Sequence, residues 1–138
     1  MKRLVLDASV ALAWVVDRNA DPYAKEVQRS LLEGIQAVVP LIWQLEVTNV
    51  LLMVQRRGLM TAEEADAGLR YFERFLASRA EVVAAFSEMR EILRLGRELN
   101  LTSYDALYLD LAIREGLPLA TLDRKLAQAA EKAGVKLA

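Results

Sequence analysis

The apolar positions of the chain fall into short runs and longer helical patterns that alternate along its length. Short runs rich in valine and leucine are typical of buried strands, and we expect strands at 4–6, 37–39, 81–83, 118–123 and 135–137. The first and fourth runs each lead into an acid, Asp7 and Asp123. An acid in this position stands at the carboxyl end of a strand, where open parallel sheets gather their ligand sites.

The segments between these runs carry helix signals. Asp21 and Pro22 predict the start of a helix, because aspartate is a good N-cap and proline fits the first turn. Thr61 and Glu64 form a capping box for another helix. Further helices are predicted from residue 8 or 9, over 41–57, from a Ser87 cap to residue 99, over 102–115 and over 124–133. Because strands and helices alternate, we expect an α/β fold, a three-layer α/β/α sandwich whose central, mostly parallel sheet has four to five short strands.

The composition narrows the chemistry that this chain can perform. Its 138 residues, of which 54% are hydrophobic, suit one compact domain over 1–138. The chain contains no histidine and no cysteine, which excludes Ser-His-Asp triads, thiolate nucleophiles and most transition-metal sites. Its net charge of -1 lacks the strongly basic character of many nucleic-acid-binding proteins. No apolar run reaches the length of a membrane span, so we expect a soluble, cytoplasmic protein.

Four acids are candidates for a shared site: Asp7, Glu46, Asp105 and Asp123. Three of them stand at predicted helix starts, where ordinary capping is the alternative role. Glu46 differs, because its neighbours one helical turn away are apolar apart from Asn49. A carboxylate on such a face is costly unless a metal ion meets it or an arginine forms a buried ion pair with it. Several carboxylates without histidine or cysteine suit Mg²⁺ or Mn²⁺.

Polar side chains near these acids are candidates for supporting roles. Ser9, Thr121 and Asn49 each stand within one turn of an acid and could hydrogen-bond a ligating carboxylate, although such residues also serve as ordinary turns and caps. Two basic pairs could contact phosphates, although such pairs are also common on solvated surfaces. They are Arg56–Arg57 and Arg124–Lys125. Asp110 faces away from the candidate acids and, four residues before Arg114, predicts a surface ion pair.

Four motifs, in this order, resemble those of the PIN domain family. They occupy residues 4–9, 43–51, 104–109 and 121–123, and each contains one of the four candidate acids. The resemblance covers essentially the whole chain, and more narrowly it is a resemblance to the VapC-type toxins of type II toxin-antitoxin modules. Four motifs in order are far more specific than any single acid.

The resemblance implies a ribonuclease of α/β/α fold that depends on Mg²⁺, with Mn²⁺ as a substitute. It also implies a homodimer that a VapB-type antitoxin holds inactive. The acids that form the metal site in this family correspond here to Asp7, Glu46, Asp105 and Asp123, and supporting positions correspond to Ser9, Asn49 and Thr121. None of the four acids is replaced, so we expect an active nuclease.

Two other functions stay open at this point. A receiver-like signalling domain also binds Mg²⁺ through an acidic cluster, but we find no convincing lysine after a later strand. A PIN fold that works only through protein contacts would explain the apolar helix over 41–57. It would also give a role to Tyr71, Phe72 and Phe75, although aromatic residues at this spacing are also common in cores.

Overall fold

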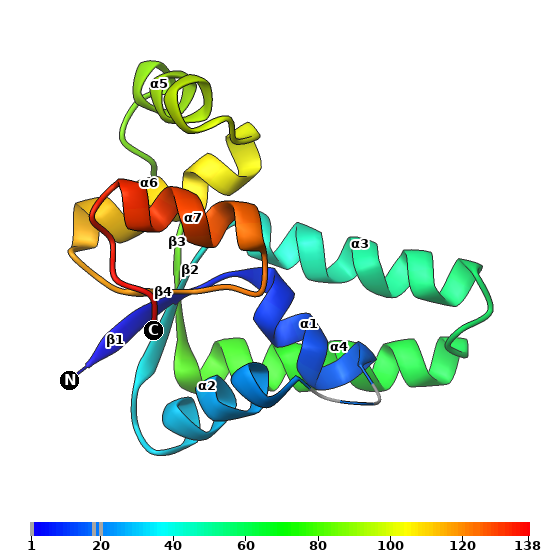
Figure 1. Cartoon of the computed structure of the whole chain (residues 1–138). Coiled ribbons are helices and arrows are strands. Elements are labelled where there is room, and N and C mark those ends of the chain that lie inside the picture. Colours follow the sequence, from blue (N-terminus) through cyan, green and yellow to red (C-terminus); the bar gives the residue numbers. More distant parts are fainter. Residues whose placement is uncertain (1, 18, 20) are drawn as a thin grey trace.

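A central parallel sheet organises the structure. The computed structural model describes residues 2–17, 19 and 21–138 (Figure 1). Four strands form among these residues: β1 (Arg3–Leu6), β2 (Gln36–Pro40), β3 (Ala80–Val83) and β4 (Leu119–Ala120). They are all parallel and lie in the order β3-β2-β1-β4. The predicted α/β fold with a central parallel sheet is therefore confirmed.

Helices cover both faces of this sheet. The described residues form α1 (Ala8–Val16), α2 (Pro22–Leu32), α3 (Ile42–Arg56), α4 (Ala62–Arg79), α5 (Met89–Leu99), α6 (Ser103–Glu115) and α7 (Arg124–Lys132). Figure 1 shows α6 and α7 on one side of the sheet, and α1, α2 and α4 on the other. The α3 and α4 helices run together as an arm beside the sheet, and α5 stands outside the layers against α6.

Most predicted helix starts have the expected chemistry. The Asp21 carboxylate accepts hydrogen bonds from two backbone N–H groups at the start of α2, and Pro22 follows it. Thr61 and Glu64 form the capping box of α4. Thr102 caps α6 by accepting a hydrogen bond from the backbone N–H of Asp105. These local signals depend on neighbouring residues alone, which is why the sequence predicts them well.

Three predicted details differ from the structure. The α5 helix begins after Glu88 and has no side-chain cap, because the Ser87 hydroxyl and N–H both donate to the buried carboxylate of Asp110 at 2.5 and 3.1 Å. The β4 strand is only two residues long. The predicted terminal strand at 135–137 contributes a single parallel bridge between Leu119 and Leu137.

Edge-to-face aromatic contacts hold the two helices of the arm together and connect the arm to α1. The Trp43 ring of α3 lies 5.7 Å from the Phe72 ring of α4, and the Trp14 ring of α1 lies 5.4 Å from the Phe75 ring of α4. Phe72 and Phe75 are buried, whereas Tyr71 is partly exposed. Two members of the predicted aromatic cluster therefore belong to the core. None of the described helices combines the length and apolar character that a membrane crossing requires.

Candidate active site

Asp7 marks the carboxyl end of β1 and is the most deeply buried of the four candidate acids. Its side chain is 5% exposed, and its Oδ2 accepts hydrogen bonds from Ser9 Oγ at 2.6 Å and Thr121 Oγ1 at 2.7 Å. The alternative role as a helix cap is wrong, because the Asp7 carboxylate makes no capping bond to α1. Both hydroxyl residues that the sequence singled out thus hold this carboxylate.

The end of β4 brings the second acid to the same edge of the sheet. The Asp7 N–H donates to Ala120 O at 2.9 Å, which joins the ends of β1 and β4. Just beyond, the Asp123 N–H donates to Thr121 Oγ1 at 2.9 Å. Asp123 Oδ1 caps α7 by accepting from the backbone N–H groups of Lys125 and Leu126. Asp123 therefore does act as a cap, and Thr121 links it to Asp7.

Glu46 and Asp105 reach the site from two helices. Asp105 lies in the first turn of α6, and its side chain is half-buried. Glu46, also half-buried, projects from the middle of α3 and accepts a hydrogen bond from the hydroxyl of Tyr108 on α6. The alternative of a buried ion pair with an arginine is not found, since no described residue forms an ion pair with Glu46. Sequence reasoning missed Tyr108, although its place three residues after Asp105 puts both side chains on one side of α6.

Charge repulsion links Asp7, Glu46 and Asp105, and the charge of Asp123 acts on two of them, Asp7 and Asp105. Burial raises the pKa of Asp7 above its ordinary value; hydrogen bonds from Ser9 and Thr121 oppose this, and the charge of Asp123 adds to it. Burial also raises the pKa of Asp105, and the charges of Asp123 and Asp7 act in the same direction. The pKa of Glu46 is raised first by burial and then by Asp7 and Asp105, while the Tyr108 hydrogen bond lowers it.

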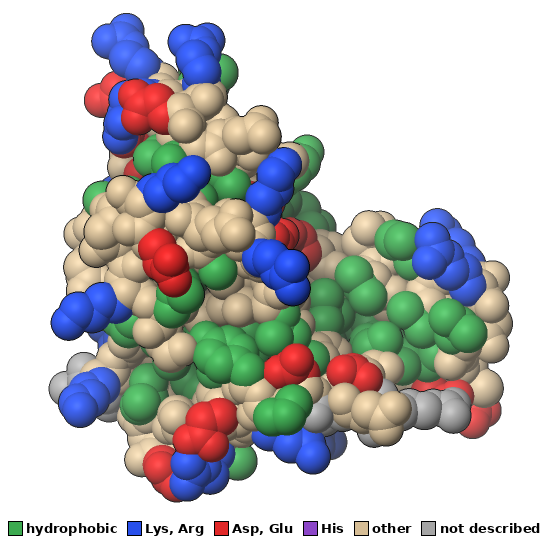
Figure 2. Space-filling view, viewed as in Figure 1, with side chains coloured by type: hydrophobic (Ala, Val, Ile, Leu, Met, Phe, Trp, Pro, Cys, Tyr) green, Lys and Arg blue, Asp and Glu red, His purple; other side chains and the backbone are tan. Residues whose placement is uncertain are grey.

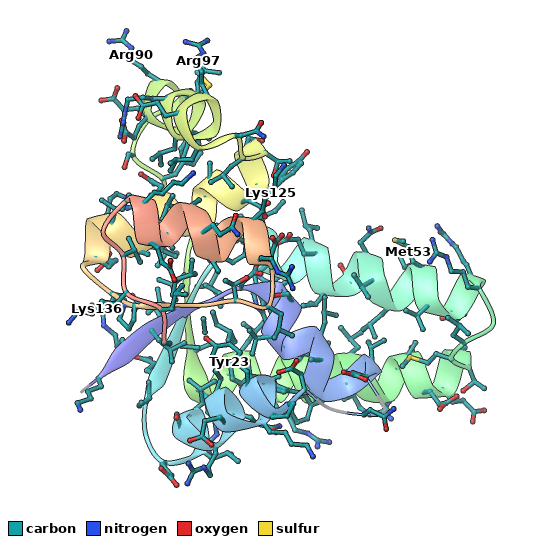
Figure 3. The ribbon with its side chains drawn as sticks, viewed as in Figure 1. Tyr23, Met53, Arg90, Arg97, Lys125 and Lys136 are labelled. Carbon is teal, nitrogen blue, oxygen red and sulfur yellow. The ribbon has the colours of Figure 1, made fainter. Side chains whose placement is uncertain are left out.

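Little positive charge balances this cluster. Among the described residues, no lysine or arginine forms an ion pair with any of the four acids. The charge of Lys125 lowers the pKa of Asp105, and Figure 3 shows Lys125 at the start of α7. The cluster therefore holds more negative charge than the chain itself compensates.

The carboxylates do not form a ready-made coordination sphere. In the part of the chain that the structure describes, no three acidic side chains are arranged to hold a metal ion. Asp123 Oδ1 is turned to the start of α7, and a Glu46 oxygen is turned to Tyr108. The donor set itself, hard oxygens with unbalanced charge, is nevertheless what Mg²⁺ and Mn²⁺ prefer.

Other predicted site residues lie apart from this cluster. Asn49 is exposed, and its amide faces Met53 Sδ at 3.5 Å rather than a carboxylate. Arg56 and Arg57 are exposed at the far end of α3.

Asp110 is 2% exposed and accepts from Arg114 Nε at 3.1 Å. The predicted Asp110 ion pair is thus present, but it is buried rather than on the surface.

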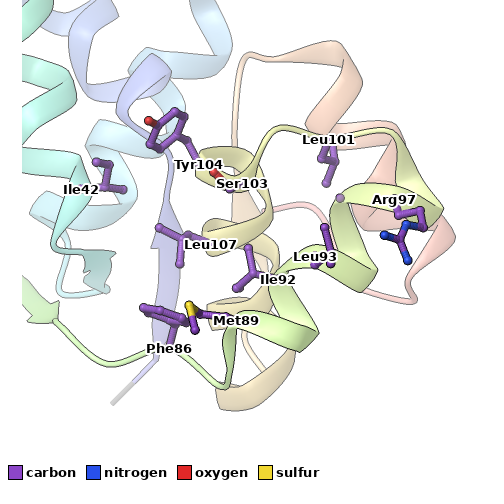
Figure 4. A pocket seen from close by; sticks show the side chains of 11 residues that line it. Ile42, Phe86, Met89, Ile92, Leu93, Arg97, Leu101, Ser103, Tyr104 and Leu107 are labelled. Carbon is purple, nitrogen blue, oxygen red and sulfur yellow. The ribbon is translucent and has the colours of Figure 1, made fainter.

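An apolar groove lies beside the acids. A cavity of about 570 Å³ opens between α5, α6 and the start of α3 (Figure 4). Tyr104, next to Asp105, and Ile42, one turn before Glu46, belong to its lining. Met89 stands at the groove with its side chain 80% exposed. The groove is therefore lined by residues from the same two helices, α3 and α6, that carry Glu46 and Asp105.

Comparisons with known proteins agree with this architecture. Ribonuclease VapC3 of Pyrobaculum aerophilum is 31% identical over 127 residues, which cover 91% of this chain and 93% of that protein. The crystal structure of PAE2754 from Pyrobaculum aerophilum has a TM-score of 0.70 and 25% identity, and covers 94% of this chain and 79% of that one.

A second structure is similar in fold alone. VapBC2 from Rickettsia felis, bound to a DNA fragment from their promoter, has a TM-score of 0.67 and 17% identity, covering 99% of this chain and 97% of that one. The profile of the PIN domain matches residues 4–132, nearly the whole chain. This match, together with the similarity to Ribonuclease VapC3 over most of both sequences, shows that the chain belongs to the PIN domain family.

Proposed function

We propose that this protein is a metal-dependent endoribonuclease that hydrolyses RNA phosphodiester bonds as the toxin of a type II toxin-antitoxin module. The observation that carries the proposal is the electrostatic cluster of Asp7, Glu46, Asp105 and Asp123, whose charge the described chain leaves unbalanced. The similarity to a protein named Ribonuclease VapC3 supports the choice of RNA as substrate.

The four acids would hold Mg²⁺, with Mn²⁺ as a substitute. A divalent ion bound there would supply a water of lowered pKa and neutralise charge that develops on the phosphate oxygens. Asp7 is fixed by Ser9 and Thr121, so it is the best ordered of the oxygen donors. Glu46 either binds the ion or orients the attacking water, which is a task that histidine performs in many enzymes and that no histidine can perform here.

The RNA backbone needs cations close to these acids. Lys125 meets this need best, because its charge already acts on Asp105, and Arg124 precedes it. Both side chains are exposed at the start of α7, where they are free to contact phosphates. Arg56 and Arg57 lie at the far end of α3, so they would contact only an RNA that extends along the arm.

We also propose a VapB-type antitoxin and a second copy of the chain as partners, and the cytoplasm as the place of action. One similar structure is named as the VapBC2 complex, which supports an antitoxin here. Figure 2 shows hydrophobic side chains gathered over the arm of α3 and α4, where Leu45, Leu52 and Leu59 are exposed. Exposed apolar surface of this kind commonly marks protein interfaces.

An RNA cleavage assay tests the proposed activity. Purified wild-type protein should cleave single-stranded RNA with Mg²⁺ or Mn²⁺ and should stop when EDTA is added. Asp105→Asn should lose about 100-fold in rate, since it removes one negative charge from the cluster. Asp66→Asn, an exposed acid on α4, serves as the matched control and should cleave like the wild type. Cleavage that survives EDTA, or that Asp105→Asn leaves intact, contradicts the proposal.

The apolar groove favours one second candidate, a PIN fold that acts only by binding proteins. The cavity between α5 and α6 and the exposed Met89 and Leu93 suit a partner's side chains. The same assay separates the two functions. A binding module would bind its partner but leave RNA intact at every metal concentration, and its acids could be replaced without loss.

A further inference from the structure

Tyr108 joins the two helices that bring acids to the site. Its side chain is 0% exposed, and its hydroxyl donates a hydrogen bond to Glu46 Oε1 on α3. The α3 helix packs mainly against α4 and α1. The Tyr108–Glu46 hydrogen bond therefore connects α3 directly to α6, at one of the four acids of the cluster.

The hydroxyl lies close to the beginning of α1 as well. Burial raises the pKa of Tyr108 far above its ordinary value, and the charges of Glu46 and Asp7 act in the same direction, whereas the backbone amide of Ala8 lowers it. The phenolic oxygen therefore has both Glu46 and the backbone of Ala8 as neighbours. A phenol keeps its proton at neutral pH, so Tyr108 is a donor to Glu46.

A buried hydroxyl at this position needs an explanation beyond packing. A phenylalanine would fill the same space without the cost of removing a hydroxyl from water. That cost is offset here because the acceptor is a carboxylate, and hydrogen bonds to charged groups are stronger than neutral ones. The bond also restricts a long side chain that would otherwise have several rotamers. It uses Oε1 and leaves Oε2 of Glu46 available for another ligand.

We propose that Tyr108 is a positioning residue: its hydrogen bond to Oε1 holds the Glu46 carboxylate at the acid cluster and leaves Oε2 for a divalent cation. This inference rests on the proposed metal site and adds to it a residue whose hydroxyl does not itself bind the ion. Groups that orient a metal ligand in this way commonly contribute tenfold to 100-fold to metal affinity.

Mn²⁺ binding by Tyr108→Phe tests the inference without any RNA. Electron paramagnetic resonance of free Mn²⁺ during a titration gives the dissociation constant directly. We expect Tyr108→Phe to bind Mn²⁺ about tenfold to 100-fold more weakly than the wild type. The matched control is Tyr71→Phe, which removes a hydroxyl that accepts from Gln28 on the other side of the sheet. It should bind Mn²⁺ as the wild type does.

A double substitution shows whether Tyr108 acts through Glu46. In a Glu46→Gln background, titrated to higher Mn²⁺ concentration, Tyr108→Phe should change the dissociation constant by less than about twofold, since coupled residues are not additive. A full effect of Tyr108→Phe in that background would overturn the inference. Thermal unfolding in EDTA completes the test, because a purely structural role would lower the melting temperature and leave Mn²⁺ affinity unchanged.

The Mn²⁺ titrations distinguish a failure of this inference from a failure of the proposed function. Wild-type protein that binds Mn²⁺, together with Tyr108→Phe that binds it equally well, refutes the role of Tyr108 and leaves the metal site standing. Wild-type protein that binds no Mn²⁺ refutes both. Weaker binding in Tyr108→Phe, no change in Tyr71→Phe, and no further loss in the Glu46→Gln background support the inference.

Discussion

At the scale of single residues, Asp7 shows how position decides the state of a carboxyl group. Burial and the charge of Asp123 raise its pKa, while the hydroxyls of Ser9 and Thr121 lower it. The pKa of Asp7 is therefore higher in the folded protein than in the unfolded protein, so protonation of Asp7 favours folding. This contribution to stability is fully present below the unfolded pKa and is lost as pH rises through the folded pKa. Asp7 therefore lowers the stability of the metal-free protein at neutral pH.

We expect Asp7→Asn to remove this penalty. In EDTA at pH 7, the variant should melt higher than the wild type by roughly 3–6 °C, the change that about 1 kcal/mol produces in a protein of this size. The difference should shrink as the pH falls towards the ordinary pKa of aspartate, where wild-type Asp7 takes up a proton. Melting curves in EDTA from pH 7 to pH 5 provide the measurement. A variant that melts below the wild type throughout this range would contradict the prediction.

A second residue, Asp110, is buried for structural reasons. Its carboxylate accepts from Ser87 Oγ, the Ser87 N–H and Arg114 Nε, and Arg114 also donates to Ala85 O. The Arg114 pairing was predictable from a spacing of four residues. The hydrogen bonds from Ser87 were not predictable, because Ser87 lies 23 positions from Asp110 in the sequence. Only the packing of α5 on α6 brings the two residues together.

Removing this acid should destabilise the fold without affecting the candidate site. Asp110→Ala leaves a partly buried arginine and a backbone N–H without their acceptor, and we expect a loss of about 3 kcal/mol in the free energy of unfolding. Urea denaturation measures the loss, and Asp66→Ala on the surface of α4 is the control. The folded variant should bind Mn²⁺ like the wild type; a tenfold weaker affinity would mean that Asp110 belongs to the site.

At the scale of elements, α1 and α4 approach each other closely at one glycine. A Cβ atom added at Gly68 would lie 2.8 Å from Val15 Cγ1 and 3.4 Å from Leu51 Cδ2. The Val15 side chain is branched at Cβ and has one strongly preferred χ1 rotamer in a helix, so it cannot easily rotate away from the added atom. The close approach explains why a residue with poor helix propensity stands inside α4.

The effect of Gly68→Ala should therefore depend on residue 15. In the wild-type background the clash should exceed the propensity gain of about 1 kcal/mol, and the free energy of unfolding should fall by roughly 1 kcal/mol. In a Val15→Ala background the contact is gone, and Gly68→Ala should stabilise the protein. Chemical denaturation of the four proteins gives the comparison. Stabilisation in both backgrounds would show that α1 and α4 are not in such close contact.

The accuracy of sequence-based prediction also varied among the elements. The starts of α2, α4 and α6 were predictable, because their caps depend on residues within one turn. The start of α5 was not, because a buried carboxylate from a distant helix takes up Ser87. The β4 strand is shorter than its apolar run predicts, since Thr121 turns its hydroxyl to Asp7 and leaves the ladder.

At the scale of the whole molecule, the parallel sheet collects at one edge acids that are far apart in sequence. Asp7 and Asp123 follow β1 and β4, neighbouring strands that end at the same edge. The position of each strand-end acid was predictable from the apolar run before it. The orientation of the Glu46 carboxylate was not, because it depends on a hydrogen bond from Tyr108 that forms only in the folded chain.

The central claim is that these four acids form one divalent-ion site, and titration calorimetry with Mn²⁺ tests it most directly. The account predicts that wild-type protein binds Mn²⁺ and that affinity falls at least tenfold in every isosteric variant of the cluster, while the surface control Asp66→Asn binds normally. The cluster variants are Asp7→Asn, Glu46→Gln, Asp105→Asn and Asp123→Asn. Wild-type protein that binds no Mn²⁺, or cluster variants that bind it as tightly as the wild type, would contradict the account.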